Sequence, residues 1–400
     1  MINRRKYVLV SSTCSEEEYD RTHIKDCYKT AQSAGKFFRL FCSGFVDNGE
    51  RIEAYTVRPT GKMESGKDYL EQKDEVVDGV VYHYARSVHR KYINRIVFMY
   101  DAFLWFLNKK NVSNNDIVII DPLRISACIG AVIACKIRGI KLVSYITDVP
   151  TCYAFGNNNN ISLWSKISYR VAETADLFIF ITDQMNEVMN KKNKPYIVVE
   201  GFADEKLNSF KVDISQKYKN PTIMYAGGVE KIYGLDILVE GFMEANIPNS
   251  ELHIYGSGSY VDEIIEKSKT YPQIKYLGCK SNAVIVAEQM KVTLLVNPRY
   301  TNADYTKYSF PSKNAEYMAS GTTTLTTKLA GMPIDYYPHV YILEEETKEG
   351  VAKKIKEILD IDPKKMFLFG QETKKWMMEN KCSKKQVQKI IDFIREEMVL

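Results

Sequence analysis

Short apolar runs alternate along the chain with longer segments in which apolar residues recur at helical spacing. In the first half, the runs that predict buried strands are residues 7–12, 51–57, 116–121, 141–147, 176–182 and 195–201. Helical segments stand between them, such as residues 124–139, where Gly139 is placed to end a helix. An Asp-Gly pair within residues 76–85 predicts a hairpin turn. This alternation is typical of a parallel sheet flanked by helices, so the sequence predicts an α/β fold.

The alternation begins again after a polar and basic stretch at residues 203–219, which we interpret as a linker. Strand-like runs then follow at residues 221–228, 251–258, 273–278, 292–298, 322–327 and 340–343. Residues 348–359 and 384–398 predict amphipathic helices. Two such halves predict two Rossmann-like domains that face a cleft, with ligands bound at the carboxyl ends of the strands. We place an N-terminal domain at residues 1–202, a C-terminal domain at residues 203–382, and a C-terminal helix at residues 383–400 that can cross back to the first domain.

The charge and the scarcity of metal-ligand patterns narrow the class of protein. A net charge of +5 in 400 residues is too small to indicate nucleic acid as a partner, but it fits an anionic substrate or an acidic membrane surface. Eight scattered cysteines without a CxxC pair indicate reduced thiols, and five isolated histidines show no metal-ligand spacing. No apolar stretch approaches the roughly 18 residues that span a bilayer, and the N-terminal residues fit a first strand rather than a signal peptide. We therefore expect a cytoplasmic protein that is at most peripheral to the membrane.

Three turns that carry glycine follow predicted strands and precede predicted helices. They contain Gly227 and Gly228, Gly256 and Gly258, and Gly35. Glycine lets backbone N–H groups approach a ligand, and the start of a helix offers unpaired donors to an anion. One such turn alone is more often a plain connection. Three turns at equivalent places favour a nucleotide diphosphate as ligand.

A fourth turn, "SFPSKNAEYMASG" at residues 309–321, begins a short predicted helix. Pro311 suits its first turn, and either Ser309 or Ser312 can cap it. Lys313 lies in that first turn, where the helix dipole disfavours a positive charge unless an anion sits in front of it. Glu316 can accept hydrogen bonds from a ribose diol. The plain alternative is a surface lysine and a solvated glutamate.

Arg299 offers a second contact for the same anion. It follows a predicted strand and Pro298, and a guanidinium can hold a phosphate through two hydrogen bonds.

The stretch "SFPSKNAEYMASGTTTLTTKLAGMP" resembles the donor-site segment of glycosyltransferase family 4, the retaining GT-B enzymes, in the branch that assembles bacterial surface polysaccharides. The segments "YAGGVEKIYGLDILVEGF", "LHIYGSGSYVDEI", "IKYLG" and "LLVNPR" are similar to this family as well, and so are "ITDVP" and "IVVEGFAD" in the first half. The resemblance implies a GT-B fold and a hexosyltransferase. Its donor would be a UDP- or GDP-sugar, and its acceptor a lipid-linked saccharide in capsule, exopolysaccharide or O-antigen synthesis.

The resemblance also assigns roles to particular positions. The second of the family's paired glutamates corresponds to Glu316 and implies a contact with the ribose, whereas the first corresponds to Tyr308. An arginine and a lysine that commonly hold the diphosphate correspond here to Gly228 and Tyr233.

Other residues must therefore hold the diphosphate. The candidates are Lys231, Arg299 and Lys313. On the acceptor side, the resemblance implies a polar group near the reaction centre at Asp148, in "ITDVP"; a turn-capping aspartate is an equal alternative.

The only DxD sequence, at Asp360 and Asp362, follows a basic helical segment and precedes a proline. We interpret it as a turn at a helix end, so we expect no metal and no cofactor, with the nucleotide sugar as substrate. The resemblance implies retention at the anomeric carbon, with the departing phosphate accepting the proton of the acceptor hydroxyl.

Residues 85–111 mix arginines and lysines with aromatic residues. Such a segment can lie on an anionic bilayer at the inner face of the membrane, or it can be a core helix. We expect its apolar face in the core and its basic end free for lipid headgroups.

The sequence bears on two other classes of function. A non-catalytic GT-B subunit that binds another transferase is the alternative favoured by Tyr308, Gly228 and Tyr233. A dinucleotide oxidoreductase is disfavoured because no strand–GxGxxG–helix unit with a following acidic residue occurs.

Overall fold

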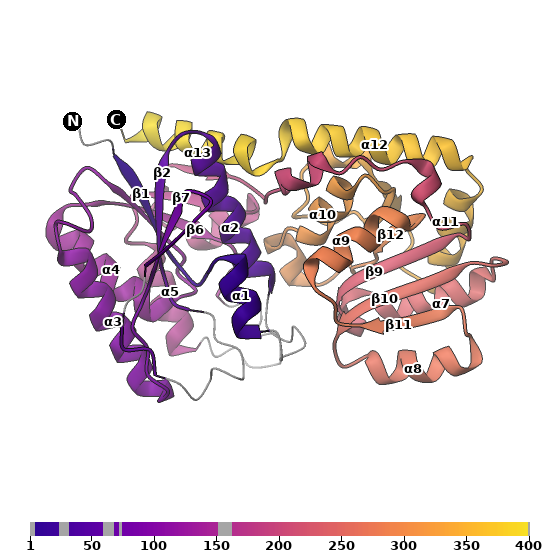
Figure 1. Cartoon of the computed structure of the whole chain (residues 1–400), viewed down its shortest axis with the longest axis horizontal. Helices are drawn as coiled ribbons and strands as arrows, with labels where there is room; N and C mark the ends of the chain where they lie inside the picture. The colour runs from indigo at the N-terminus through magenta and orange to yellow at the C-terminus, as the bar shows by residue number, and fades with distance from the viewer. Residues whose placement is uncertain (1–4, 24–31, 59–67, 72–73, 151–161, 399–400) are drawn as a thin grey trace. The chain divides into compact units, whose positions relative to one another are not determined.

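The computed structural model describes residues 5–23, 32–58, 68–71, 74–150 and 162–398. The chain folds into two compact units (Figure 1). The first unit extends to Phe202 and includes the segment from Ser383 onward, and the second comprises Ala203–Cys382. Each unit is an α/β structure built on a single sheet.

The sheet of the first unit has eight strands among the described residues, in the order β3-β4-β2-β1-β5-β6-β7-β8. All neighbours pair in parallel except β3 and β4, which form an antiparallel hairpin. The strands are β1 (Lys6–Ser11), β2 (Arg51–Thr56), β3 (Asp74–Val77), β4 (Val80–Tyr84), β5 (Ile117–Ile120), β6 (Lys141–Ile146), β7 (Leu177–Phe180) and β8 (Tyr196–Val198). Asp78 and Gly79 connect the hairpin with positive φ angles, which confirms the predicted turn.

The helices of the first unit cover this sheet. They are α1 (Glu16–His23), α2 (Gln32–Asp47), α3 (Lys91–Leu107), α4 (Ile125–Arg138), α5 (Leu163–Ala172), α6 (Gln184–Met189) and α13 (Ser383–Glu397). Gly139 ends α4 in the left-handed conformation, as predicted. The last helix packs on α2, where Gly44 leaves room for the side chain of Val387.

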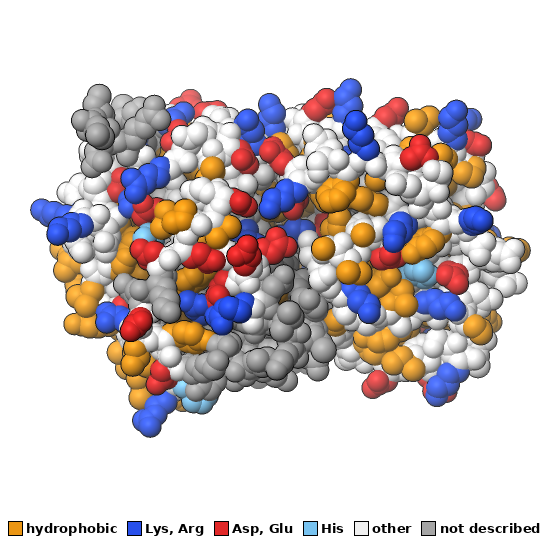
Figure 2. All heavy atoms as spheres, in the orientation of Figure 1, with side chains coloured by type: hydrophobic (Ala, Val, Ile, Leu, Met, Phe, Trp, Pro, Cys, Tyr) orange, Lys and Arg blue, Asp and Glu red, His pale blue; other side chains and the backbone are white. Residues whose placement is uncertain are grey.

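The apolar face of α3 belongs to the core of the first unit, as predicted. Ala102 and Phe106 are fully buried and join a cluster that includes Val8 of β1 and Ala131 of α4. Figure 2 shows hydrophobic side chains also at the edge of the molecule where Figure 1 draws α3 and α4. None of the helices in the described ranges is both long enough and apolar enough to cross a bilayer.

The sheet of the second unit has six strands, all parallel, in the order β11-β10-β9-β12-β13-β14. They are β9 (Thr222–Gly228), β10 (Glu251–Ser257), β11 (Ile274–Gly278), β12 (Leu294–Asn297), β13 (Thr324–Thr327) and β14 (Tyr341–Leu343). The α-helices are α7 (Leu235–Ala245), α8 (Val261–Thr270), α9 (Asn282–Lys291), α10 (Ser312–Ser320), α11 (Lys348–Leu359) and α12 (Pro363–Asn380). The 3₁₀ helices are η2 (Glu205–Ser209), η3 (Ile214–Gln216), η4 (Lys231–Tyr233), η5 (Asp304–Tyr308) and η6 (Ile334–His339).

The structure corrects the interpretation of residues 203–219 and bears out that of the DxD sequence. The stretch 203–219 is not a structureless linker, because it contains η2 and η3 and lies within the second unit. The DxD sequence does lie at helix ends: Asp360 ends α11, and Asp362 caps α12 by accepting from the backbone N–H groups of Lys364 and Lys365.

Candidate functional site

Two glycine-bearing strand ends meet at the carboxyl edge of the second sheet. Gly227 of β9 pairs with Gly256 of β10, and both have φ angles in the range that favours glycine, 152° and 128°. A Cβ on Gly256 would overlap the carbonyl oxygen of Gly227, and a Cβ on Gly258 would overlap that of Val229. The two loops therefore approach each other more closely than any side chain would permit.

Lys313 reaches this edge from the first turn of α10. Its side chain passes beside Gly227, where a Cβ would overlap its terminal carbon and nitrogen atoms. The Nζ atom donates a hydrogen bond to the hydroxyl of Tyr225, which itself donates to the carbonyl of Gly228 at 2.7 Å. Burial, together with the nearby charge of Arg299, lowers the pKa of Lys313 to about 7. The first turn of α10 holds no acidic residue that would offset this.

Arg299 and Lys313 share one aromatic neighbour, Tyr233 of η4. The guanidinium carbon of Arg299 lies 5.5 Å from the centre of the Tyr233 ring, and the Nζ atom of Lys313 lies 5.4 Å from the same centre. Arg299 also donates to Ser309 Oγ at 3.3 Å and lies over the ring of Tyr305. Two of the three residues predicted to hold a diphosphate therefore converge on one spot, where an anion would relieve the repulsion between their charges.

Glu316 lies one turn further along α10, and two amide side chains of α9 hold its carboxylate. Gln289 Nε2 donates to Oε1 at 2.8 Å, and Asn282 Nδ2 donates to Oε2 at 3.3 Å. Gln289 is fully buried, whereas Glu316 is half-buried. A carboxylate is an acceptor with about four lone-pair sites, which is the kind of group to which a ribose hydroxyl can donate.

The third predicted diphosphate contact, Lys231, has other partners. It is exposed, forms an ion pair with Glu263 at 2.7 Å and lies over the ring of Tyr260. The described contacts of Lys231 are therefore with Glu263 and Tyr260, whereas Lys313 and Arg299 share Tyr233, and Lys231 stays a candidate without a described contact to that pair. Tyr308, at the end of η5, lies under the Nζ atom of Lys307.

The predicted cap of α10 is wrong. Pro311 occupies the N-cap position and no side chain caps the helix. Ser312 is exposed as the first helical residue, and Ser309 instead accepts from Arg299. A helix start without a side-chain cap suits an anion, with the N–H of Asn314 already donating to the carbonyl of Pro311 at 2.8 Å.

The remaining candidates lie in the first unit. Asp148 follows β6, is half-buried, and helps to raise the pKa of Asp121. Burial is the main reason that the pKa of Asp121 rises to about 6. Gly35 lies in the first turns of α2, where its carbonyl accepts from Thr13 Oγ1 at 3.1 Å.

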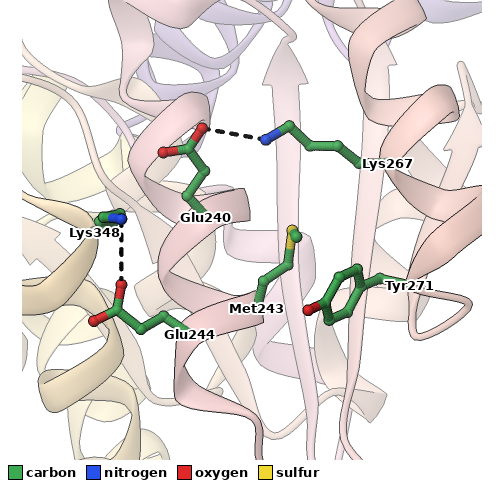
Figure 3. Close-up of a pocket in the computed structure, with 6 residues that line it drawn as sticks. All are labelled: Glu240, Met243, Glu244, Lys267, Tyr271 and Lys348. Carbon is green, nitrogen blue, oxygen red and sulfur yellow. Dashed lines mark hydrogen bonds and ion pairs between the residues drawn. The ribbon is translucent and has the colours of Figure 1, made fainter.

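A hollow of about 420 Å³ in the second unit lies elsewhere, between α7, α8 and α11 (Figure 3). Its charged residues pair with one another: Lys267 with Glu240 at 3.2 Å, and Lys348 with Glu244 at 3.8 Å. Since these pairs neutralise the hollow and its lining residues come from helices and a helix end, it is a weaker candidate than the sheet edge.

Sequence reasoning missed residues that surround the candidates, among them Tyr225, Tyr233 as the shared neighbour of the two cations, and the two amides Asn282 and Gln289. Tyr225 belongs to a strand and Gln289 to a helix without a motif, so only their position in space reveals them. A partial indication was present at position 233, where Tyr233 stands in place of a lysine that is common in the family that the sequence resembles.

Comparisons with known families and solved structures indicate the class of protein. Residues 220–360 match the model of the family described as Glycosyl transferases group 1. No curated protein matches the chain. The fold is that of the GT-B glycosyltransferases, and the structural likeness extends over nearly the whole chain. Together, the family match and the fold support a GT-B glycosyltransferase.

Three solved structures illustrate the likeness. Sucrose-phosphate synthase from Thermosynechococcus elongatus has a TM-score of 0.70 at 13% identity, covering 99% of this chain and 100% of that one. HepE of Anabaena in complex with UDP-glucose has a TM-score of 0.66 at 12% identity, covering 98% and 99%. The lipopolysaccharide outer core galactosyltransferase WaaB has a TM-score of 0.61 at 15% identity, covering 98% and 99%.

Proposed function

We propose that this chain is a retaining family 4 glycosyltransferase. It would transfer a hexosyl group from a UDP- or GDP-sugar to a lipid-linked saccharide, in the synthesis of a capsule, exopolysaccharide or O-antigen. The observation that carries the proposal is the convergence of Lys313 and Arg299 at the uncapped start of α10. The comparison with HepE, solved with UDP-glucose, supports a nucleotide-sugar donor, and that with WaaB supports a saccharide acceptor.

The proposed chemistry needs stabilisation of the leaving group. As the bond between the anomeric carbon and the diphosphate oxygen breaks, negative charge grows on the diphosphate. Lys313, Arg299 and the N–H groups of α10 would stabilise it, and we propose that no metal takes part. The acceptor oxygen bonds to the anomeric carbon on the same face, and its proton passes to the departing phosphate. Glu316 would hold the ribose.

The first unit would supply the acceptor site. Asp148 stands at the carboxyl end of β6, where ligands of such sheets bind, and is our candidate for contact with the acceptor. A lipid-linked acceptor would place the enzyme in the cytoplasm at the inner face of the membrane.

Hydrolysis of the donor in the absence of acceptor tests the proposal. We expect slow release of sugar from UDP- or GDP-sugars, with the anomeric configuration of the donor retained in the first product seen by NMR. Lys313→Ala should lower the rate roughly 100-fold, since it removes a group that stabilises the leaving charge. Lys356→Ala, which removes an exposed lysine of α11, should leave the rate unchanged.

A non-catalytic subunit remains the second candidate, favoured by Gly228, Tyr233 and Tyr308 in place of the family's usual residues. That reading predicts no hydrolysis of any donor by the wild-type chain. Equal rates for wild type and Lys313→Ala would contradict the proposed site.

A further inference from the structure

The outer side of α3 carries a stripe of large apolar side chains. The exposed apolar residues of this helix are Tyr92, Ile93, Ile96, Tyr100, Leu104 and Leu107. They recur every three or four residues and so lie on one side of the helix. Tyr92 is 75% exposed, and Ile96 and Tyr100 are each 61% exposed. An apolar stripe of this length indicates an interaction surface, because single exposed residues would need no explanation.

Two neighbouring helices extend the stripe. The helix α4 packs closely on α3, since Gly130 has no room for a Cβ beside the α3 backbone, and it exposes Ile133 and Ile137. At the start of α5, the ring centre of Trp164 lies 4.4 Å from the guanidinium carbon of Arg95 on α3. We call the exposed apolar residues of α3 together with Ile133, Ile137 and Trp164 the α3–α4 surface. Hydrophobic side chains gather at this edge in Figure 2.

The charges on these helices are nearly all positive. Each of α3, α4 and α5 carries two lysines or arginines, whereas the one acidic residue in the three sequences is Asp101. Asp101 is 2% exposed and accepts from Arg86 Nε at 2.6 Å, so it adds no negative charge to the surface. Lys109 and Lys110, just beyond α3, are exposed as well. Asp68 is an exposed acid near the start of α3 and accepts from a backbone N–H.

We propose that the α3–α4 surface docks on an anionic phospholipid bilayer. Aliphatic side chains would enter the boundary of the acyl chains, Tyr92, Tyr100 and Trp164 would sit at headgroup level, and the lysines and arginines would meet lipid phosphates. A second copy of the chain is disfavoured as the occupant, because it would bring two sets of positive charges together. This inference rests on the proposed function in one respect: a lipid-linked acceptor gives the enzyme a reason to bind a membrane.

Vesicle flotation with the full chain tests the apolar part of the surface. We expect wild type to float with vesicles of phosphatidylcholine and phosphatidylglycerol. Ile96→Gln combined with Tyr100→Gln should weaken binding roughly tenfold or more, because it removes two side chains that would leave water. Ile334→Gln is the matched control, because it alters an isoleucine that is 82% exposed on the second unit. Thermal unfolding followed by circular dichroism checks that each variant is folded.

A second experiment tests whether the positive charges contribute to membrane binding. Binding should be weak to vesicles of phosphatidylcholine alone and should fall as salt rises. Lys109→Glu combined with Lys110→Glu should weaken binding to the anionic vesicles, whereas Lys364→Glu with Lys365→Glu, an exposed pair on α12, should not.

Three outcomes would overturn the proposal. They are no binding of wild type to anionic vesicles, equal binding by the apolar double variant, and a dimer in light scattering that the double variant abolishes. Titration with UDP and GDP separates this proposal from the proposed function. Vesicle binding without nucleotide binding would support the α3–α4 surface as a membrane-binding site and would contradict the proposed transferase function.

Discussion

Lys313 combines two environments that disfavour a positive charge. It is partly buried against Gly227 and Tyr225, and it shares the neighbourhood of Tyr233 with Arg299. Both effects lower its pKa, burial being the larger. Burial and the neighbouring guanidinium make the charged form of this lysine costly in the protein without ligand. A bound diphosphate would favour the charged form of Lys313 and so offset this cost.

The lowered pKa of Lys313 predicts an affinity for UDP that depends on pH. In the protein without ligand, the pKa of Lys313 is about 7. A bound anion favours the charged form, so the pKa of Lys313 rises when UDP binds. Below pH 7 the group is already charged in the free protein. Above pH 7 the side chain of Lys313 is mostly neutral in the free protein and must take up a proton when UDP binds. The affinity for UDP therefore falls as the pH rises. From about pH 7 to about pH 8.5, the dissociation constant of UDP should rise roughly tenfold by this linkage.

Calorimetry at several pH values measures this dependence. UDP suits the experiment because its terminal phosphate, with a pKa of about 6, is almost fully ionised over this range. Lys313→Arg is the control, since arginine stays charged and should flatten the profile. A flat profile for wild type would show that Lys313 does not titrate on binding.

Gly228 and Tyr233 are two departures from the family pattern that the structure links. The ring of Tyr233 lies so close to Gly228 that a Cβ there would be 2.9 Å from a ring carbon. A glycine at 228 is thus what makes room for the tyrosine at 233. Residue types and spacing could identify Lys313, Arg299 and Glu316 as candidates. They could not show that Lys231 turns to Glu263, because the direction of a side chain depends on its neighbours in space.

At the scale of elements, the strand ends shape the site. The close approach of β9 and β10 depends on Gly256, where a Cβ would meet the backbone of Gly227 rather than a movable side chain. A Cβ on Gly227 would instead meet the end of the Lys313 side chain. The backbone N–H groups of these loops are thereby held at the same edge as the start of α10.

Gly256→Ala should therefore destabilise the second unit strongly. We expect a loss of at least about 3 kcal/mol in the free energy of unfolding, since the new Cβ adds overlap to an unfavourable φ angle. Gly278→Ala is the matched control at the end of the neighbouring strand. It also has a positive φ, 69°, but nothing lies within 4 Å of its Cβ, so about 1 kcal/mol is expected. Urea unfolding measures both, and equal losses would mean that the contact relaxes without cost.

The elements themselves differ in how far the sequence reveals them. Strands such as β5, in which every residue is buried, appear as continuous apolar runs because parallel sheets are covered on both faces. By contrast, α1 is not predicted because its sequence, "EEEYDRTH", is polar throughout. The 3₁₀ helix η5 is missed as well, since so short a turn leaves no period to detect. The site depends on η4 and on the loop after β12, which are elements of this less visible kind.

At the scale of the whole molecule, the two units would have different tasks. The second unit carries the convergent cations, the uncapped helix start and the oriented Glu316, which suit a nucleotide diphosphate. The first unit carries Asp148 and the α3–α4 surface, which suit an acceptor delivered by a membrane. The fold and the family match support a GT-B glycosyltransferase. The account stands on nucleotide binding by the second unit.

The most direct test is calorimetric titration of the whole chain with UDP and GDP in the absence of metal. One nucleotide should bind, and Glu316→Ala should weaken it roughly tenfold, because a charge-assisted hydrogen bond to the ribose is lost. Glu349→Ala, at an exposed position of α11, should bind like wild type. Failure of both nucleotides to bind, or equal affinity of wild type and Glu316→Ala, would contradict the account.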